Sequence, residues 1–196
     1  TIKFSIQDSS DYIEVFTTRP DTLFGVTYLV VAPEHNLIEN YNLHKNNKIE
    51  SYCIKASNKS ELQRSDLDKS KSGISSGLYA IHPISNKKIP IWIADYVMIT
   101  YGTGAIMAVP AHDQRDYDFA KKFDIEMVTV IDDGSNTNIR QEAFTGSGVN
   151  INSDFLNGLT TKEAITSMLI YLEKNKIGKR MVTYKLKDWL ISRQRY

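Results

Sequence analysis

The sequence predicts a strand-rich mixed α/β domain whose sheet is curled or closed rather than doubly wound. Apolar and alternating runs typical of strands recur from residue 12 to residue 131, without the regular helical alternation of a Rossmann order. The 196 residues, 41% hydrophobic and 24% charged, have the length and composition of one globular domain with a sizeable core. These observations predict the fold class.

The first half of the chain predicts two strands and then a helical stretch. Tyr12–Phe16 alternates between apolar and polar residues, whereas Val26–Ala32 (VTYLVVA) is too apolar to have a face in water. One or two helical turns are expected at Glu34–Asn40. A further helix presents one face made of Ile49, Tyr52, Cys53 and Ala56. Ser60 with Gln63 three residues later forms a capping-box pattern, and the Ser/Lys/Gly-rich segments 55–60 and 68–77 are expected to be exposed loops.

The second half returns to strands and ends in a helix. The expected strands are Gly77–Pro83, Ile89–Ile99, Ala105–Val109 and Glu126–Ile131. A short helix should run from about Asp113 to Phe123, and Thr160 with Glu163 forms a second capping box. The apolar stripe of this last helix is Ile165, Met168, Leu169 and Leu172, with Gly178 at its end.

Charge and cysteine content exclude several classes of protein. The formal net charge is +1, from 24 basic and 23 acidic side chains, so any RNA contact should be local rather than a general electrostatic attraction. The single cysteine, Cys53, excludes an internal disulfide and a Cys-based zinc cluster, and is interpreted as a buried structural thiol. No apolar run reaches the roughly 20 residues that span a bilayer, and the first residues do not form a signal peptide. A cytosolic location is therefore expected.

The stretch Thr17–Gly25 (TTRPDTLFG) lies between two predicted strands and is unusually polar. Pro20 pushes the preceding residue towards extended backbone, and Asp21 after it suits a type I turn, so an ordinary turn accounts for the stretch. The alternative is that the threonine hydroxyls line the rim of a pocket, with Arg19 available for a phosphate or carboxylate. From the residue types alone, the plain turn is favoured.

A second stretch, YGTGAIMAVPAHDQRD, combines glycines before a strand with carboxylates at a helix start. The glycines do not form a phosphate-binding loop, because neither Gly-Lys-Ser/Thr nor G-x-G-x-x-G follows. Asp113 and Asp116 have the spacing of N-cap and N3 residues, and for Asp116 this structural role and a chemical role are equally supported. His112 beside Asp113 suggests a metal site. The remaining histidines are not spaced as metal ligands, so the metal hypothesis is weak. Pattern alone does not define the reaction.

Together, TTRPDTLFGVTYLVVAPEH and YGTGAIMAVPAHDQRDYDFA resemble two regions of the editing domain of bacterial-type leucyl-tRNA synthetase, also called connective polypeptide 1. The closing DWLISRQRY resembles the point where that chain re-enters the synthetase core, and only about 40–75 and 133–157 carry little of the resemblance. It implies a β-barrel-like editing domain with peripheral helices over residues 1–196, as a fragment of a larger synthetase. Residues 185–196 would begin the strand that returns to the catalytic core.

The resemblance implies post-transfer editing, which is hydrolysis of the aminoacyl ester of mischarged tRNA(Leu) while leucyl-tRNA(Leu) is spared. In this double sieve, a second site hydrolyses what a hydrophobic synthetic pocket cannot reject. The resemblance assigns Thr17 and Thr18 to the aminoacyl-adenosine end and the attacking water, and Asp116 to the α-ammonium group. These three form the implied catalytic set. The implied substrate-binding set is Arg19, at the tRNA 3′ end; Asp21; Thr22, which blocks the leucyl side chain; and Tyr101, Met107, Val109, His112 and Asp113.

The same resemblance implies no metal and no cofactor in this domain, since ATP and Mg²⁺ serve aminoacylation by the full-length enzyme. The motifs of that reaction, His-x-Gly-His and Lys-Met-Ser-Lys-Ser, do not occur in these residues. The implied partners are the 3′-terminal adenosine of tRNA(Leu) with its amino acid and the rest of the synthetase in cis. A monomer in the cytoplasm or an organelle, with no membrane contact, is expected. Two alternatives stay open: a non-catalytic module that binds the tRNA 3′ end and, more distantly, a metal phosphohydrolase built on His112 and Asp113.

Overall fold

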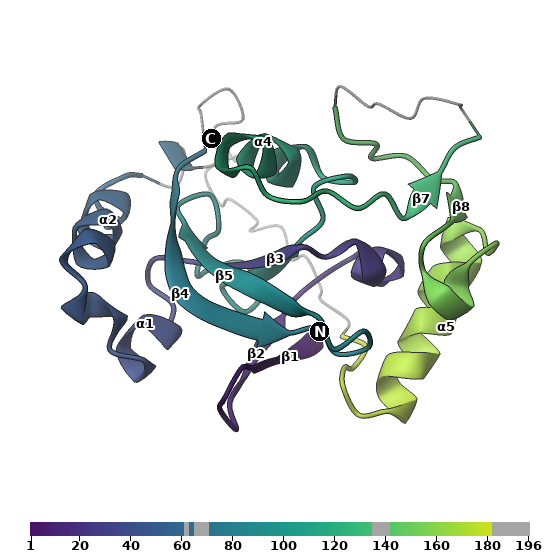
Figure 1. Ribbon diagram of the computed structural model, residues 1–196, viewed down its shortest axis with the longest axis horizontal. Helices are drawn as coiled ribbons and strands as arrows, with labels where there is room; N and C mark the ends of the chain where they lie inside the picture. Colours follow the sequence, from purple (N-terminus) through teal and green to yellow (C-terminus); the bar gives the residue numbers. More distant parts are fainter. Residues whose placement is uncertain (61–62, 65–70, 135–141, 182–196) are drawn as a thin grey trace, which may run out of the picture.

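A six-stranded sheet forms the centre of the computed structural model, which describes residues 1–60, 63–64, 71–134 and 142–181 (Figure 1). The strand order is β2-β1-β4-β5-β3-β6, and all neighbours are antiparallel except β3 and β5. The strands are β1 (Ile2–Ile6), β2 (Tyr12–Val15), β3 (Tyr28–Val31), β4 (Gly73–Ile81), β5 (Lys88–Ala94) and β6 (Ala105–Ala108). The predicted mixed α/β class is confirmed. The order is that of an open sheet, but its edge strands β2 and β6 approach each other, as in a curled sheet.

Strand β3 lies between two apolar cores, as the continuous run VTYLVVA predicts. Its four residues are all fully buried, and alternate side chains point to opposite faces. Leu29 and Val31 join the larger core, which also contains Met168 and Leu172 of α5 (Thr161–Lys174). Tyr28 and Val30 join the second core with Phe119 of α4 (Gln114–Phe123). Each face of the sheet is therefore covered by its own helix.

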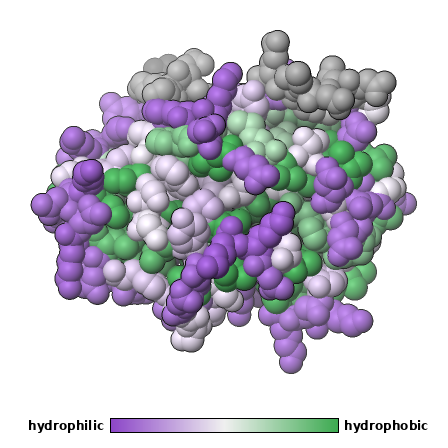
Figure 2. All heavy atoms as spheres, viewed as in Figure 1, coloured by the Kyte–Doolittle hydropathy of each residue, from purple (hydrophilic) through white to green (hydrophobic). Residues whose placement is uncertain are grey.

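The remaining elements are short and surround the sheet. They are the helices α1 (Leu37–Asn40) and α2 (Asn47–Ser57), the 3₁₀ helices η1 (Pro20–Gly25), η2 (Leu43–Lys45) and η3 (Asp154–Leu156), and the two-stranded ribbon of β7 (Ile131–Asp132) and β8 (Val149–Asn150). In Figure 1, η1 lies beside α5, and the ribbon lies above the same helix. Hydrophilic residues dominate the surface over α1 and α2, whereas hydrophobic residues reach the surface nearer the middle of this face (Figure 2).

Both predicted capping boxes form. The Ser60 N–H donates to Gln63 Oε1 at 3.0 Å, and the Gln63 N–H donates to Ser60 Oγ at 3.2 Å. The Thr160 N–H donates to Glu163 Oε2 at 3.0 Å at the start of α5. Cys53 lies in α2 and is half-buried rather than fully buried, and this partial burial raises the pKa of its thiol. None of the helices in the described part of the chain has the length and apolarity to cross a membrane.

Several strand bounds differ from the predicted ones, for reasons that depend on distant residues. Strand β1 was not predicted, and it forms by pairing with both β2 and β4. Residues 73–76, expected as loop, begin β4 because they pair with the end of β5. Strand β5 ends at Ala94, before the predicted Ile99, where the backbone N–H of Asp95 turns to the Tyr52 hydroxyl at 3.0 Å. Of the strand predicted over 126–131, only Ile131 pairs. Residues 185–196, the predicted return to a catalytic core, lie outside the described residues.

Candidate functional site

The two polar stretches meet at one cavity of about 140 Å³. One wall is the segment after β2 together with η1, and the other is β6 with the start of α4. Every predicted site residue except Asp21 lines this cavity: Thr17, Thr18, Arg19, Thr22, Tyr101, Met107, Val109, His112, Asp113 and Asp116. Phe16, Ile106 and Arg115 also line it and were not predicted. The cavity therefore joins residues that are far apart in the sequence.

The first wall is both a turn and a pocket rim, so the two interpretations of TTRPDT are compatible. Pro20 occupies the first turn of η1, where its missing N–H costs no hydrogen bond. Thr17 Oγ1 accepts the Arg19 N–H at 3.0 Å, and Thr22 Oγ1 donates to the Arg19 carbonyl at 2.9 Å. Since the Thr22 hydroxyl is held by the turn itself, the methyl group is the part of this side chain left to limit the cavity.

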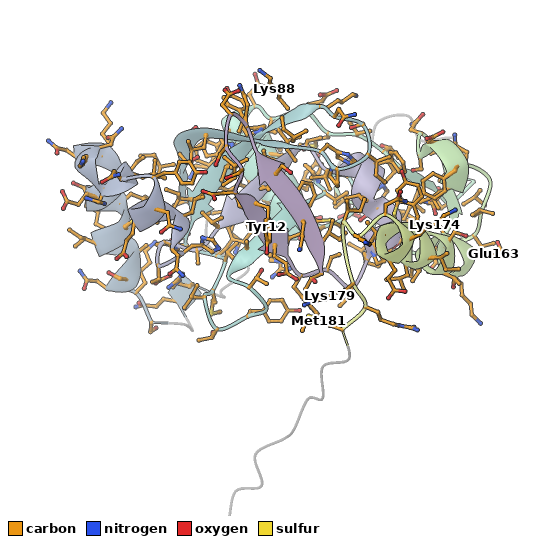
Figure 3. All side chains as sticks on the ribbon, turned by 90° about the horizontal axis from the view of Figure 1, so that it is seen from below. Tyr12, Lys88, Glu163, Lys174, Lys179 and Met181 are labelled. Atoms are coloured by element: carbon orange, nitrogen blue, oxygen red, sulfur yellow. The ribbon has the colours of Figure 1, made fainter. Side chains whose placement is uncertain are left out.

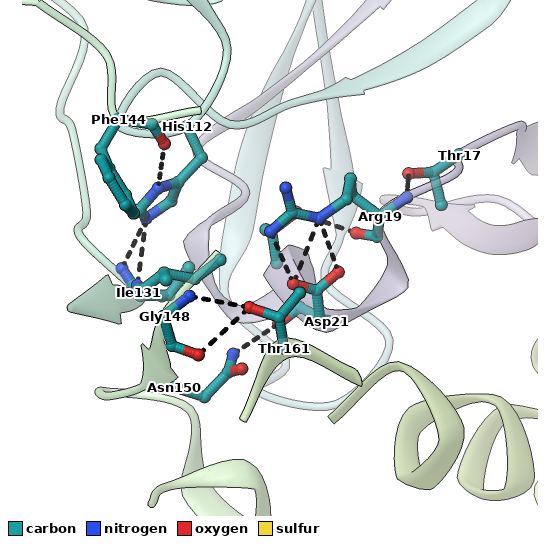
Figure 4. Close-up of polar contacts among 11 residues, drawn as sticks. Thr17, Arg19, Asp21, His112, Ile131, Phe144, Gly148, Asn150 and Thr161 are labelled. Carbon is teal, nitrogen blue, oxygen red and sulfur yellow. Dashed lines mark hydrogen bonds and ion pairs between the residues drawn. The ribbon is translucent and has the colours of Figure 1, made fainter. Parts of the chain in front are cut away.

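Arg19 and Asp21 form a two-pronged ion pair behind the rim (Figure 4). The Nε of Arg19 lies 3.0 Å from Asp21 Oδ1, and its Nη2 lies 2.9 Å from Oδ2. Asp21 is 0% exposed, so its carboxylate depends on this guanidinium for compensation. The pair fixes the shape of the turn, and Nη1 of Arg19 is the part of the guanidinium outside this two-pronged contact.

Two buried residues from elsewhere in the chain hold η1 in place. Asn150 of β8, 0% exposed, donates from Nδ2 to the Asp21 carbonyl at 2.9 Å (Figure 4). His82 accepts backbone N–H groups of residues 84 and 85 at Nδ1, so Nε2 carries the hydrogen and donates to the Leu23 carbonyl at 2.9 Å. Burial lowers the pKa of His82, in keeping with a neutral ring. Sequence analysis missed both residues, because neither belongs to a recognisable motif.

Asp116 provides a buried carboxylate at the second wall. Asp113 caps α4 by accepting the N–H groups of Arg115 and Asp116 at 2.9 and 3.3 Å, as predicted. Asp116 itself is 4% exposed, and its carboxylate accepts the Val109 N–H at 2.9 Å and the Tyr96 hydroxyl at 3.3 Å. Burial, and secondly the negative charge of Asp113, raise the pKa of Asp116 to about 7. When ionised, such a buried carboxylate binds a cation strongly, because little water competes for it.

His112 has a structural geometry although it borders the cavity. Its Nε2 accepts the backbone N–H groups of Val130 and Ile131 at 2.9 and 3.2 Å, so the hydrogen resides on Nδ1, which donates to the Phe144 carbonyl at 2.9 Å (Figure 4). Both ring nitrogens therefore bind backbone and hold the β7 segment against the site. Within the described ranges, no three His, Cys, Asp or Glu side chains gather in a way that could hold a metal ion.

Comparison with known proteins identifies the family of this fold. Residues 1–173 match the family model described as the leucyl-tRNA synthetase editing domain. A crystal structure described as the ternary complex of Agrobacterium radiobacter K84 agnB2 LeuRS, tRNA and LeuAMS superposes with a TM-score of 0.72 and 29% sequence identity. The match covers 96% of this chain and 20% of that one, so the chain spans about a fifth of that relative's length.

The fold is that of an aminoacyl-tRNA synthetase editing domain. The chain belongs to the leucyl-tRNA synthetase editing domain family. The resemblance of the two sequence stretches to this family is confirmed.

Substituting Asp116 with Asn should stabilise the chain at neutral and alkaline pH. The raised pKa of Asp116 means that its ionisation opposes folding, with no cost below its ordinary pKa and a full cost above about pH 7. The gain in free energy of unfolding should therefore be absent near pH 4, grow as the pH rises, and level off at on the order of 4 kcal/mol above pH 7. Urea unfolding across this range measures it. Asp118→Asn, an exposed carboxylate of the same helix, is the control; equal pH dependence in both variants would contradict the account.

Substituting Asn150 with Ala should destabilise the chain by about 1–3 kcal/mol, because the Asp21 carbonyl loses its buried donor. Asn175→Ala is a matched control, since its Nδ2 makes the same kind of bond to the Tyr171 carbonyl at 2.8 Å on the exposed surface. Urea unfolding should show little change for this control. Similar losses in the two variants would argue that Asn150 does not hold η1.

Proposed function

We propose that this chain hydrolyses the ester bond between a noncognate amino acid and the 3′ end of tRNA(Leu), and that it spares leucyl-tRNA(Leu). The observation that carries this proposal is that Thr22 and Asp116, from opposite walls, line the same small cavity. One residue limits the size of the side chain, and the other offers a negative charge for the amino group. An editing site needs both, because it must hold every aminoacyl ester in one orientation and still distinguish one amino acid from the rest.

Asp116 is the proposed anchor of the α-ammonium group. The Val109 N–H and the Tyr96 hydroxyl leave lone pairs on both carboxylate oxygens, so a protonated amine can still bind. A bound ammonium would lower the raised pKa of Asp116 and so favour the ionised form. Such a charge-assisted contact fixes the ester carbonyl relative to the attacking water.

Thr22 is the proposed gauge of side-chain size. Its hydroxyl is bound to the Arg19 carbonyl, and Asn150 and His82 hold the helix that carries it. Because Thr22 is held in this way, a larger side chain cannot push it aside without breaking buried hydrogen bonds. The leucyl side chain would then be excluded, whereas noncognate side chains that fit the space reach the hydrolytic position.

The hydrolytic step proposed here uses water and no covalent intermediate. Water attacks the ester carbonyl carbon, the bond from that carbon to the ribose oxygen breaks, and the ribose oxygen takes a proton as the free amino acid leaves. In this proposal, Thr17 and Thr18 would hydrogen-bond the adenosine end and the water, with the vicinal ribose hydroxyl of the substrate as a further donor. His112 does not act as the base in this proposal, because both its ring nitrogens bind backbone.

The other predicted residues complete the proposed substrate contacts. Arg19 would bind the tRNA 3′ end through the part of its guanidinium not paired with Asp21, and Asp21 would act by holding Arg19. Tyr101, Met107, Val109, His112 and Asp113 would shape the cavity around the substrate. We propose that residues 1–196 act as one editing unit of a longer synthetase, on esters made by the rest of that enzyme in cis, without a cofactor of their own.

The proposal is tested by adding the chain to tRNA(Leu) charged with isoleucine or norvaline, with leucyl-tRNA(Leu) as the spared substrate. Substituting Thr22 with Ala should remove the limit on size, so the rate of leucyl ester hydrolysis should rise by about 10–100-fold. Thr103→Ala, a half-buried threonine outside the cavity lining, should leave the discrimination unchanged. Binding of charged tRNA without hydrolysis by the unsubstituted chain would instead support a non-catalytic module.

Substituting Tyr96 with Phe should move the acid limb of the pH–rate profile to higher pH. The Tyr96 hydroxyl donates to the carboxylate and lowers the pKa of Asp116, so its removal should raise that pKa and with it the limb by about 0.5–1 pH unit. Tyr52→Phe is the control, since the Tyr52 hydroxyl donates to the backbone carbonyl of Ser72 at 2.9 Å, outside the lining of the cavity. An unmoved limb in the Tyr96 variant would show that ionisation of Asp116 does not set the pH dependence of hydrolysis.

A further inference from the structure

A second hollow, of about 270 Å³, lies directly beside the editing cavity. We call it the outer hollow. The two share one wall made of Phe16, Thr17 and Thr18, the residues that follow β2. The two hollows are therefore adjacent, and successive units of one chain molecule are a kind of ligand that adjacent hollows can take.

The far side of the outer hollow combines an apolar surface with two cations. Helix α5 contributes Ile165, Leu169 and Leu172, and the segment after it contributes the exposed side chains of Lys179 and Arg180. Figure 3 shows Lys179 and Met181 between the strand that carries Tyr12 and helix α5. No acidic side chain is among the described residues that line the hollow. The Glu14 carboxylate lies 4.0 Å from Lys179 Nζ, a weak contact at an exposed site, and Glu173 Oε1 accepts the backbone N–H of Arg180 at 3.2 Å.

We propose that the outer hollow binds the nucleotide that precedes the terminal adenosine of the RNA substrate. Its base would lie on the apolar side chains of α5, and the phosphate that joins it to the terminal adenosine would pair with Lys179 and Arg180. A single-stranded nucleotide presents this combination, an apolar base face beside an anionic phosphate. The inference rests on the proposed function, because it takes the terminal adenosine to occupy the editing cavity.

The wall between the two hollows favours a nucleotide over a peptide or a lipid. The ring of Phe16, in the shared wall, meets edge to face the ring of Tyr101, which lines the editing cavity and not the outer hollow; the centroids are 5.9 Å apart and Tyr101 is 60% exposed. Aromatic rings at a rim between two sites give successive bases a surface on which to stack. Since the net charge of the chain is only +1, a local pair of cations is also what a chain of this composition needs to bind a phosphate.

The test compares noncognate aminoacyl esters carried on adenosine and on the dinucleotide CpA, with the 196-residue chain as the enzyme. The unsubstituted chain should show a KM about tenfold lower for the CpA ester, the gain expected of one phosphate contact and one stacked base. In the double variant Lys179→Ala/Arg180→Ala this difference between the two esters should largely vanish. Log KM for charged tRNA should also become less dependent on log salt, by a slope of about 0.7 for each lost phosphate contact.

Lys87→Ala/Lys88→Ala is the matched control, because it removes an adjacent pair of exposed lysines elsewhere. Figure 3 shows Lys88 on the opposite side of the molecule from Lys179. This control should keep both the tenfold difference and the salt slope. Equal KM values for the two esters in the unsubstituted chain would overturn the proposed nucleotide-binding role of the outer hollow, and so would a full CpA gain in the Lys179/Arg180 variant. Either result would leave the editing function intact. Failure of the unsubstituted chain to hydrolyse any of the esters would overturn the editing proposal itself.

Discussion

The editing cavity depends on the fixed position of one short 3₁₀ helix, η1. The helix carries Thr22, and three contacts hold it from behind: the Arg19–Asp21 pair, the Asn150 amide on the Asp21 carbonyl, and the His82 ring on the Leu23 carbonyl. A size limit of one methyl group separates substrates by only about 1–3 kcal/mol, and the limit fails if the backbone beneath it moves. Rigid support of η1 is therefore as necessary to selectivity as Thr22 itself.

The opposite wall shows a conflict between stability and function. A carboxylate that is nearly inaccessible to water costs free energy when it ionises, and the pKa of Asp116, raised to about 7, expresses that cost. The Val109 N–H and the Tyr96 hydroxyl reduce the cost without removing it. In the proposed function, the ammonium of the substrate supplies the missing positive charge, so this free-energy cost of ionising Asp116 is offset only when an amine-bearing ligand is bound.

The sequence predicts the parts of this molecule that depend on neighbouring residues. The apolar run of β3, the capping boxes at Ser60 and Thr160, and the N-cap role of Asp113 all follow from local pattern. The resemblance of the two contiguous motifs to a known family, rather than their pattern alone, predicts the residues of the cavity. Long-range contacts leave no such pattern. Strand β1 is an exception, because Ile2–Ile6 alternates between apolar and polar residues and pairs with the neighbouring β2, although sequence analysis did not predict it. Asn150, His82 and Tyr96, by contrast, act on residues that are far away in sequence. Asp21 illustrates the limit: the motif contains it, yet it lies behind the cavity and pairs with Arg19.

The most direct test of the central claim is a crystal structure of the chain with a non-hydrolysable amide analogue of norvalyl-adenosine. The account predicts that the α-ammonium nitrogen lies about 3 Å from the Asp116 carboxylate. It also predicts that the end of the norvalyl side chain contacts the methyl group of Thr22, with η1 unmoved. An analogue bound with its ammonium away from Asp116, or with its side chain directed away from Thr22, would contradict the account.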